Sequence, residues 1–319
     1  MTPFTAAVVQ TASVAFDPGR TVDKLGEFAR RAAANGARLV LFPEAFVGGY
    51  PKGLDFGTRV GWRTPQGRDA FRTYYDGAIE VPDAHTRRMG EIAAELAIHL
   101  VTGVIERERG TLYCTALFFG PDGVLLGKHR KLMPTAAERL VWGFGDGSTL
   151  VAFDTPLGTL GAVICWENYM PMLRMAMFAK GVTLYCAPTA DDRETWLATM
   201  RHVALEGRCF VLSACQFARR CDYPADYPIE GEPGPDAVLM RGGSCIVGPL
   251  GQILAQPRFD TDAILTAEID PAEVARGKFD FDVVGHYARP DVFRLSVDER
   301  VQSAVRTNQS AVTRAIADE

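Results

Sequence analysis

No apolar run in this 319-residue sequence approaches the ~18 residues of a membrane-spanning helix. The first residues, MTPFTAAVVQTASVAF, lack the charged start and the long apolar stretch of a signal peptide. Basic and acidic side chains, 34 and 39 in number, are mixed along the chain, so no basic stripe indicates a surface for nucleic acid or membrane. We therefore expect a cytoplasmic protein that binds neither of them.

Several catalytic and ligand-binding motifs are also missing. The sequence has no C-x-x-C pair and no histidine cluster, which argues against a zinc site. The stretch WGFGDGS is rich in glycine but lacks the spacing of a phosphate-binding loop, and no G-x-S-x-G nucleophile elbow occurs. The seven cysteines are spread through apolar stretches, and their odd number favours reduced thiols over a disulfide framework.

The chain does contain an alternation of short β-like runs and amphipathic helical patterns. Gly-Pro-x-Gly turns at 120–123 and 248–251 predict two hairpins, because proline presets the turn and glycine accepts a positive dihedral angle. Strands are further predicted at 5–10, 37–45, 99–107, 157–167, 182–190 and 209–217, and helices at 19–34, 84–97, 171–181 and 191–207.

The two halves of the chain resemble each other. FARRAAANGARLVLFPEA (28–45) aligns with MAMFAKGVTLYCAPTA (175–190), since each runs from a helix through glycine to a buried strand and a proline. Near-continuous apolar strands indicate sheets that are buried on both faces. We therefore predict an α/β fold, a four-layer αββα sandwich built from two similar halves, over residues 1–290. Residues 291–319 turn polar and are predicted to form a C-terminal tail that contributes to oligomer contacts.

Chemically active side chains fall where predicted strands end. Loops at the carboxyl ends of strands can be shaped without disturbing the core, so functional groups gather there. Covalent thiol catalysis requires a carboxylate that takes the thiol proton, a sulfur that attacks and an ammonium that stabilises negative charge. Glu44 ends LVLFPE, Lys131 ends VLLGKHRK, Cys165 ends LGAVIC and Thr189 ends TLYCAPT.

Each of these side chains also has an ordinary structural explanation. Free cysteine is among the most buried residue types, but WEN breaks the apolar run after Cys165, and a helix start at Pro171 would modestly favour a thiolate. Glu44 could pair at a strand end, although desolvation within FPEAF would raise its pKa, as a base needs. Lys131 fits a solvated basic run, and Glu138 fits an exposed helical surface.

Four segments decide between these explanations: LVLFPEAFVGGYP, GKHRKLMPTAAERLVWGFGDGS, GAVICWENYMP and GHYARPDVF. They resemble the signature segments of nitrilases, within the carbon–nitrogen hydrolase superfamily, in the same order over about residues 4–295. The resemblance implies the αββα sandwich. It also implies hydrolysis of an organic nitrile to the carboxylic acid and ammonia through a cysteine thioimidate and thioester, with no metal and no other cofactor.

The resemblance also implies roles for the strand-end residues. Glu44 would be the general base, Lys131 would stabilise the tetrahedral intermediates, Glu138 would be the second carboxylate and Cys165 would be the nucleophile. The substrate would be a small-molecule nitrile, and the family leads us to expect a homodimer or a larger homo-oligomer.

Residues beside these segments are predicted to serve the same site. Aromatic side chains would line an apolar pocket around the organic group of the substrate. Packing inside the sandwich is an equally good explanation for Trp142. The predicted pocket residues are Tyr50, Trp142, Trp166 and Thr189, and the predicted supporting residues are Glu167 and His129, the latter acting on Lys131.

Other functions remain open. An amidase or carbamoylase would apply the same four residues to an amide, although Trp166 and WGFGDG resemble the nitrilase branch, within which cyanide or β-cyanoalanine are further substrates. A catalytically silent assembly protein would keep the fold, but the complete Glu-Lys-Glu-Cys set argues against it. A redox-sensing thiol protein would need a resolving cysteine near Cys165, and none is evident in the sequence.

Overall fold

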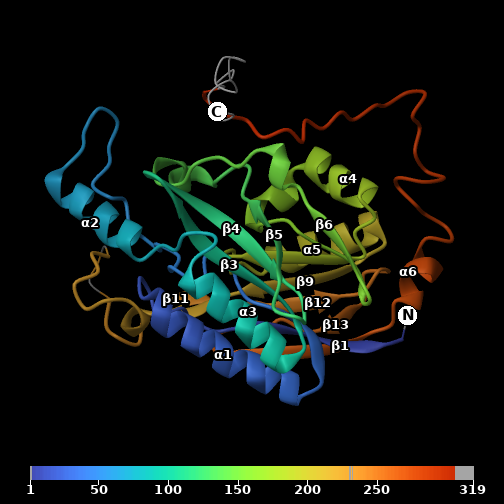
Figure 1. The fold of residues 1–319 in the computed structure, drawn as a ribbon, viewed down its shortest axis with the longest axis horizontal. Coiled ribbons are helices and arrows are strands. Elements are labelled where there is room, and N and C mark those ends of the chain that lie inside the picture. Colours follow the sequence, from blue (N-terminus) through green and yellow to red (C-terminus); the bar gives the residue numbers. More distant parts are fainter. Residues whose placement is uncertain (1, 230, 232, 306–319) are drawn as a thin grey trace, which may run out of the picture.

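The computed structural model describes residues 2–229, 231 and 233–305, and it contains two six-stranded mixed sheets (Figure 1). The first sheet has the strand order β14 (Ala263–Ile269), β1 (Phe4–Gln10), β2 (Ala37–Leu41), β3 (His99–Glu108), β4 (Thr111–Phe119) and β5 (Leu125–Arg130). The second has the order β13 (Ile253–Ala255), β12 (Cys245–Val247), β9 (Phe210–Cys215), β8 (Leu184–Thr189), β7 (Gly158–Ala162) and β6 (Ala152–Thr155).

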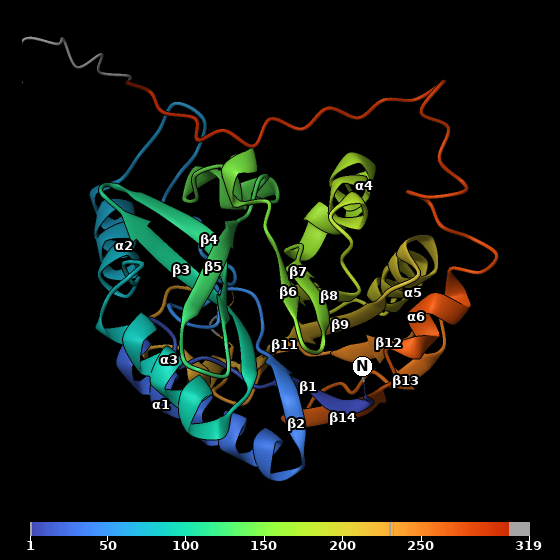
Figure 2. The same cartoon turned by 45° about the vertical axis from the view of Figure 1, so that its right-hand side comes forward.

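Two pairs of helices cover the outer faces of the sheets. Helices α1 (Pro18–Ala34) and α3 (Ala84–Leu96) pack on the first sheet, and α4 (Pro171–Ala179) and α5 (Thr195–Gly207) pack on the second. Figure 2 shows the two pairs on opposite sides of the molecule, with the sheets between them. The predicted α/β class and the four-layer αββα sandwich are therefore confirmed.

The sequence of α1 explains its place. Asp17 caps the helix by accepting a hydrogen bond from Arg20 N at 2.9 Å, and Pro18 occupies its first turn. Apolar side chains recur every three to four residues, so Leu25 and Phe28 share the face that is buried against the sheet. Burial of such side chains, ~1.5–3 kcal/mol each, is what holds the helix on the sheet.

The inner faces of the two sheets form a common core. Leu39 and Val101 from the first sheet pack with Ile164 and Leu212 from the second. β2 pairs in parallel with β1 and β3, and β8 pairs in parallel with β7 and β9, which directs the carboxyl ends of neighbouring strands to one edge of each sheet. The residues that follow β2, β7 and β8 therefore meet between the sheets.

Some elements differ from those predicted. The strand expected at 157–167 is limited to β7, because the chain turns at Cys165 into a short 3₁₀ helix, η3 (Cys165–Tyr169). The sequence analysis did not predict β6, β14, the short α6 (Ala272–Gly277) or α2 (Pro65–Asp76), and it missed the pair β10 (Phe217–Arg219) and β11 (Val238–Arg241). Short 3₁₀ turns η1 (Ala136–Leu140), η2 (Gly147–Thr149) and η4 (Arg220–Asp222) complete the chain.

The described part of the predicted tail, residues 291–305, is an exposed segment without helix or strand. Figure 1 shows residues 291–305 running back across the molecule past α4. There Gln302 N donates to Asp146 Oδ2 at 2.8 Å, and Lys180 pairs with Glu299 at 2.5 Å. Residues 306–319 lie outside the described part, and a role of the tail in oligomer contacts remains a prediction. No helix in the described ranges has the length and apolar character to cross a membrane.

Gly103, in β3, packs closely against the backbone of Pro43 and Glu44, which follow β2. A Cβ on Gly103 would lie 2.4 Å from Pro43 O and 2.7 Å from Glu44 Cα, so the backbone would have to shift. We predict that Gly103→Ala lowers the free energy of unfolding by about 1–3 kcal/mol, as overpacking does, and displaces Glu44. Urea unfolding measures the first effect. Gly110→Ala is the control, because a Cβ there meets no atom within 4 Å, and equal stability of the two variants would contradict the prediction.

Candidate active site

Glu44 reaches the space between the sheets because the chain leaves β2 along β3. Gly103 N donates to Pro43 O at 3.0 Å, which holds the segment against the sheet. From the second sheet, Gln216 Nε2 donates to the carbonyl of Glu44 at 3.1 Å. Ala45 has a left-handed backbone, with φ of 49°, so the chain turns immediately after the carboxylate. The side chain of Glu44 is fully buried.

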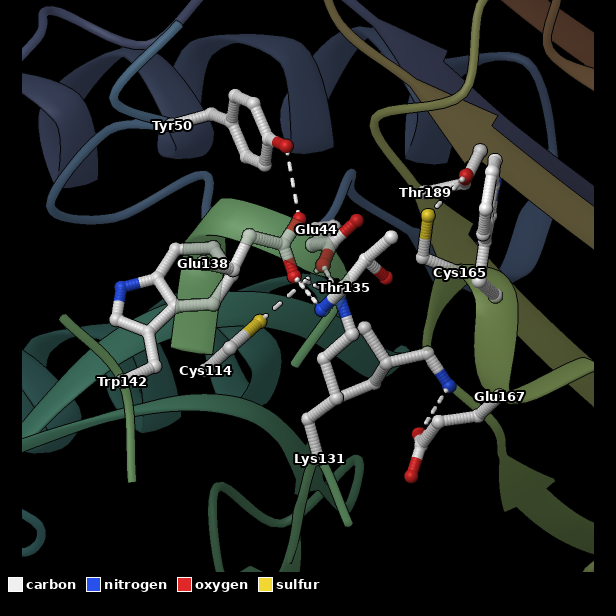
Figure 3. A network of polar contacts seen from close by, with 12 residues as sticks. Glu44, Tyr50, Cys114, Lys131, Thr135, Glu138, Trp142, Cys165, Glu167 and Thr189 are labelled. Carbon is white, nitrogen blue, oxygen red and sulfur yellow. Dashed lines mark hydrogen bonds and ion pairs between the residues drawn. The ribbon is translucent and has the colours of Figure 1, made fainter. Parts of the chain in front are cut away.

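Lys131 joins two carboxylates inside the protein (Figure 3). Its Nζ donates to Glu44 Oε1 at 2.6 Å and to Glu138 Oε2 at 2.8 Å. Glu138 belongs to η1, where Thr135 N donates to its Oε2 at 2.6 Å. Tyr50 contributes its hydroxyl to Glu138 Oε1 at 2.8 Å. The structure thus brings together three residues that are 87 and 7 positions apart along the chain.

The pKa values in this cluster follow from burial and charge. Burial raises the pKa of Glu44 above the ordinary value, although the charge of Lys131 lowers it in part. Burial, the largest single effect, would lower the pKa of Lys131, but the surrounding acidic groups, Glu44 first among them, together outweigh it and the pKa lies well above the usual range. The ammonium therefore remains charged, while the carboxylate is a stronger base than an exposed glutamate.

Cys165 lies at the sharp turn between β7 and η3. Its φ of 51° places a non-glycine residue in the left-handed region, a conformation that costs about 1–3 kcal/mol and is concentrated at functional sites. Asn168 Nδ2 holds the turn by donating to Cys165 O at 2.8 Å and to Val163 O at 3.0 Å. Thr189, at the end of β8, donates its hydroxyl to the sulfur at 3.1 Å. Figure 3 shows this thiol facing the carboxylate of Glu44.

The thiol is neutral in this environment. Burial and then the charge of Glu44 raise the pKa of Cys165, which the charge of Lys131 and the hydrogen bond from Thr189 lower only in part. Any modest effect of the helix start at Pro171 in favour of a thiolate is thus smaller than the combined effect of desolvation and the neighbouring carboxylate. A thiol of this kind reacts only if a base removes its proton.

His129 and Glu167 form a clamp beside the cluster. Glu167 accepts from Leu132 N at 2.6 Å, from Ile164 N at 2.9 Å and faces His129 Nε2 at 3.1 Å. Leu132 directly follows Lys131, and Ile164 directly precedes Cys165, so one buried carboxylate fixes the backbone next to both. The predicted support by His129 thus runs through Glu167, because its other ring nitrogen faces Thr149 O and not the ammonium.

The predicted pocket residues have different places. Tyr50 lines a cavity of about 530 Å³, together with Leu54, Phe56, Val141 and Glu138. Trp166 lines a smaller cavity of about 260 Å³, which shares Thr135 and Ala136 with the first. In contrast, Trp142 is buried in the core, where its Nε1 donates to Tyr74 at 3.1 Å. Lys131 lies over its ring at 5.4 Å, so Trp142 forms a wall behind the ammonium. Thr189 contacts the sulfur and lines neither cavity.

Comparison with known proteins agrees with this architecture. A family model described as carbon-nitrogen hydrolase matches residues 5–279. The chain belongs to the carbon–nitrogen hydrolase family. An aliphatic nitrilase of Sinorhizobium fredii is 60% identical over 307 residues, which cover 96% of this chain and 99% of that protein. A bifunctional nitrilase/nitrile hydratase of Lupinus angustifolius is 54% identical over 314 residues, 97% of this chain and 90% of that protein.

Solved structures of more distant proteins share the fold of this carbon–nitrogen hydrolase. A carbon-nitrogen hydrolase of Helicobacter pylori superposes with a TM-score of 0.71 at 20% identity, over 91% of this chain and 96% of that one. Nit3 of Saccharomyces cerevisiae, from the nitrilase superfamily, gives a TM-score of 0.69 at 23% identity, over 90% and 97% of the two chains. At such identities the likeness concerns the fold alone.

The sequence analysis missed three contacts of the site. Gln216 holds the backbone of Glu44 from the opposite sheet, and Asp191 accepts from Trp166 Nε1 at 2.8 Å. Cys114, in β4, places its sulfur 3.5 Å from Glu44 Oε1. The predicted hairpin pairs the strand of Cys114 with the strand that ends at Lys131, but it does not give the register that places these two residues opposite each other.

The clamp of this carbon–nitrogen hydrolase can be tested by Glu167→Gln. Both carboxylate oxygens accept a backbone N–H, and an amide has only one accepting oxygen, so at least one N–H loses its partner. We predict that the free energy of unfolding falls by about 1–3 kcal/mol in urea titrations. Glu108→Gln is the control, because that exposed glutamate pairs only at the surface with Arg130. A Glu167→Gln protein as stable as the control would show that the clamp adds nothing.

Proposed function

We propose that this carbon–nitrogen hydrolase is a nitrilase, which converts an organic nitrile and two waters into a carboxylic acid and ammonia. The observation that carries the proposal is the buried contact of one ammonium with two carboxylates beside a strained, neutral thiol. Relatives that are named nitrilases and are up to 60% identical support the choice of nitriles over amides. Distant amidases share only the fold with this chain.

In the proposed first step, Glu44 takes the proton of Cys165 and the sulfur attacks the nitrile carbon. The C–S bond forms as one C≡N π bond breaks, and the proton passes to nitrogen to give a thioimidate. Lys131 faces the atom on which negative charge develops, and in this water-poor space its stabilisation of that charge is strong. Thr189 donates to the sulfur, which disperses the negative charge of the thiolate.

The proposed second half consumes water. Glu44 removes a proton from a water whose oxygen adds to the thioimidate carbon, and that proton passes to nitrogen to give a tetrahedral intermediate that carries a hydroxyl and an amino group. The hydroxyl proton then passes to the same nitrogen as the C–N bond breaks, so ammonia leaves with both protons of the water and a thioester remains. A second water, activated in the same way, releases the acid and restores the Cys165 thiol. Glu138 keeps Lys131 in place throughout, because it binds the ammonium beside Glu44 and is itself held by Tyr50.

The cavity beside Glu138 supports a substrate with an apolar organic group. Its lining is mostly apolar, with Leu54, Phe56 and Leu140 among the side chains, and Lys52 and Asp55 supply charges. A volume of about 530 Å³ is within the range of small-molecule sites. We propose aliphatic or arylaliphatic nitriles of this size as substrates.

Ammonia and acid release from a panel of nitriles and their matching amides tests the proposed function. We expect phenylacetonitrile or aliphatic dinitriles to be hydrolysed, and Cys165→Ala to abolish turnover because the variant lacks the sulfur that forms the proposed covalent intermediate. Cys221→Ala, which removes an exposed thiol, should leave turnover unchanged. Turnover of amides alone would identify an amidase instead, and a protein silent on all substrates would contradict the proposal.

The pH dependence follows from the two pKa shifts. Glu44 must be ionised to act as base, so kcat/KM should rise with pH through a pKa that burial places above the ordinary glutamate value. The Cys165 pKa is also raised, so thiol ionisation should give no second rise between about pH 8 and 10. Glu44→Gln should reduce kcat by about 100-fold or more. A pH profile that rises with thiol ionisation would contradict the assignment of Glu44 as base.

A further inference from the structure

The cluster contains a second thiol that the proposed reaction does not use. Cys114 is buried in β4, with its sulfur 3.5 Å from Glu44 Oε1. Its backbone carbonyl accepts from Lys131 N at 2.8 Å. Cys114 therefore contacts the proposed base with its side chain and the backbone of the proposed ammonium residue with its main chain.

The two oxygens of the Glu44 carboxylate have different surroundings. Oε1 is bound by Lys131 Nζ at 2.6 Å and is approached by the Cys114 thiol, whereas Oε2 is buried and has no hydrogen-bond partner among the described residues. In Figure 3 the carboxylate lies between Cys114 on one side and Cys165 on the other. One oxygen is thus held, and the other is available to exchange a proton.

Cys114 can act only as a donor in this contact. Burial and the charge of Glu44 raise the pKa of the Cys114 thiol well above its usual range, so the sulfur keeps its proton. A glutamate carboxylate rotates readily about its last torsion, and one donor on one oxygen leaves that rotation open. A second donor on the same oxygen, from a different direction, fixes the carboxylate plane.

We propose that Cys114 is a positioning residue whose thiol donates to Glu44 Oε1 and leaves Oε2 as the oxygen that exchanges protons with Cys165 and water. The inference rests on the proposed function in one respect, namely that Glu44 is the base. Because a donor stabilises the ionised carboxylate, loss of the thiol should raise the pKa of Glu44.

The test removes the donor while keeping the volume. Cys114→Val is compared with Cys186→Val, since Cys186 lies in the same inter-sheet core but its sulfur makes no hydrogen bond within the described chain. The measurement is the rate at which iodoacetamide alkylates Cys165 as a function of pH, read from the mass of the peptide that contains it. The exposed Cys221 is the internal reference.

The acid limb is the pH range over which the alkylation rate of Cys165 rises as the proposed base ionises. We expect its midpoint to move up by about half a pH unit in Cys114→Val, as loss of one weak hydrogen bond to a charged group predicts. In Cys186→Val the midpoint should not move. Cys114→Ser keeps a donor and should return the limb toward the parent position. Cys114→Ala replaces the valine variant if the latter does not fold, which circular dichroism would show.

Two results would overturn the inference. One is an acid limb at the parent position in the donor-free variants, and the other is a serine variant whose limb moves as far as that of valine. Nitrile turnover is scored separately. A protein that alkylates with the expected shift but hydrolyses no nitrile would refute the proposed function while supporting the positioning role of Cys114.

Discussion

The site depends on one buried ammonium that is shared by two carboxylates. Lys131 is 1% exposed and lies within 2.8 Å of both Glu44 and Glu138. Moving a charge from water into a protein costs several kcal/mol, and only close, well-directed partners offset that loss. Because one positive charge faces two negative ones, the cluster keeps an excess of negative charge. That excess, added to burial, keeps the pKa values of Glu44 and Cys165 raised, so a protonated thiol lies beside a carboxylate of raised basicity in one buried space.

Holding these groups together requires both sheets. Glu44 and Lys131 come from the first sheet and Cys165 from the second, so their spacing depends on the distance between the sheets as well as on each loop. Glu167 links the two sides of the site, because its carboxylate accepts hydrogen bonds from the backbone N–H after Lys131 and from the backbone N–H before Cys165. Gln216, which directly follows β9 of the second sheet, forms another link between the sheets by donating to the carbonyl of Glu44. The inter-sheet core and these polar contacts thus determine the catalytic geometry together.

Much of this architecture could be predicted from sequence, since burial on both faces of a strand and proline or glycine at its end leave clear patterns. Glu44, Lys131 and Cys165 could be singled out because each follows a predicted strand, and strands that run in the same direction bring their carboxyl ends to one edge of a sheet. Elements without such a pattern were missed. Helix α2 fully buries only Gly67 and Tyr74, and its remaining apolar side chains are only partly covered, so its buried face is too narrow to stand out in the sequence.

The contacts inside the site were harder to predict. Glu138 sits on a five-residue 3₁₀ turn with no periodic signal, and only the family resemblance indicated it. Cys114 lies opposite Lys131 only because a bulge between Phe118 and Phe119 shifts the hairpin register by one residue. A one-residue slip turns every side chain to the other face of the sheet, so the turn alone could not identify this contact. The direction of the Cys165 pKa shift was also missed, because desolvation depends on three-dimensional burial.

The residues proposed to carry out the reaction and those that line the proposed substrate cavity come largely from different parts of the chain. The proposed catalytic groups follow strands of the two sheets and are held by buried hydrogen bonds, whereas the cavity is formed by the segment 50–58 and by η1. Tyr50 and Glu138 belong to both, since their hydrogen bond connects the cavity wall to the ammonium. A change in Leu54 or Phe56 would therefore alter the fit of an organic group, where one methylene is worth only ~1–3 kcal/mol, without moving the reacting atoms. A change in Tyr50 would reach Lys131 through Glu138, so this residue is where substrate binding and catalysis cannot vary independently.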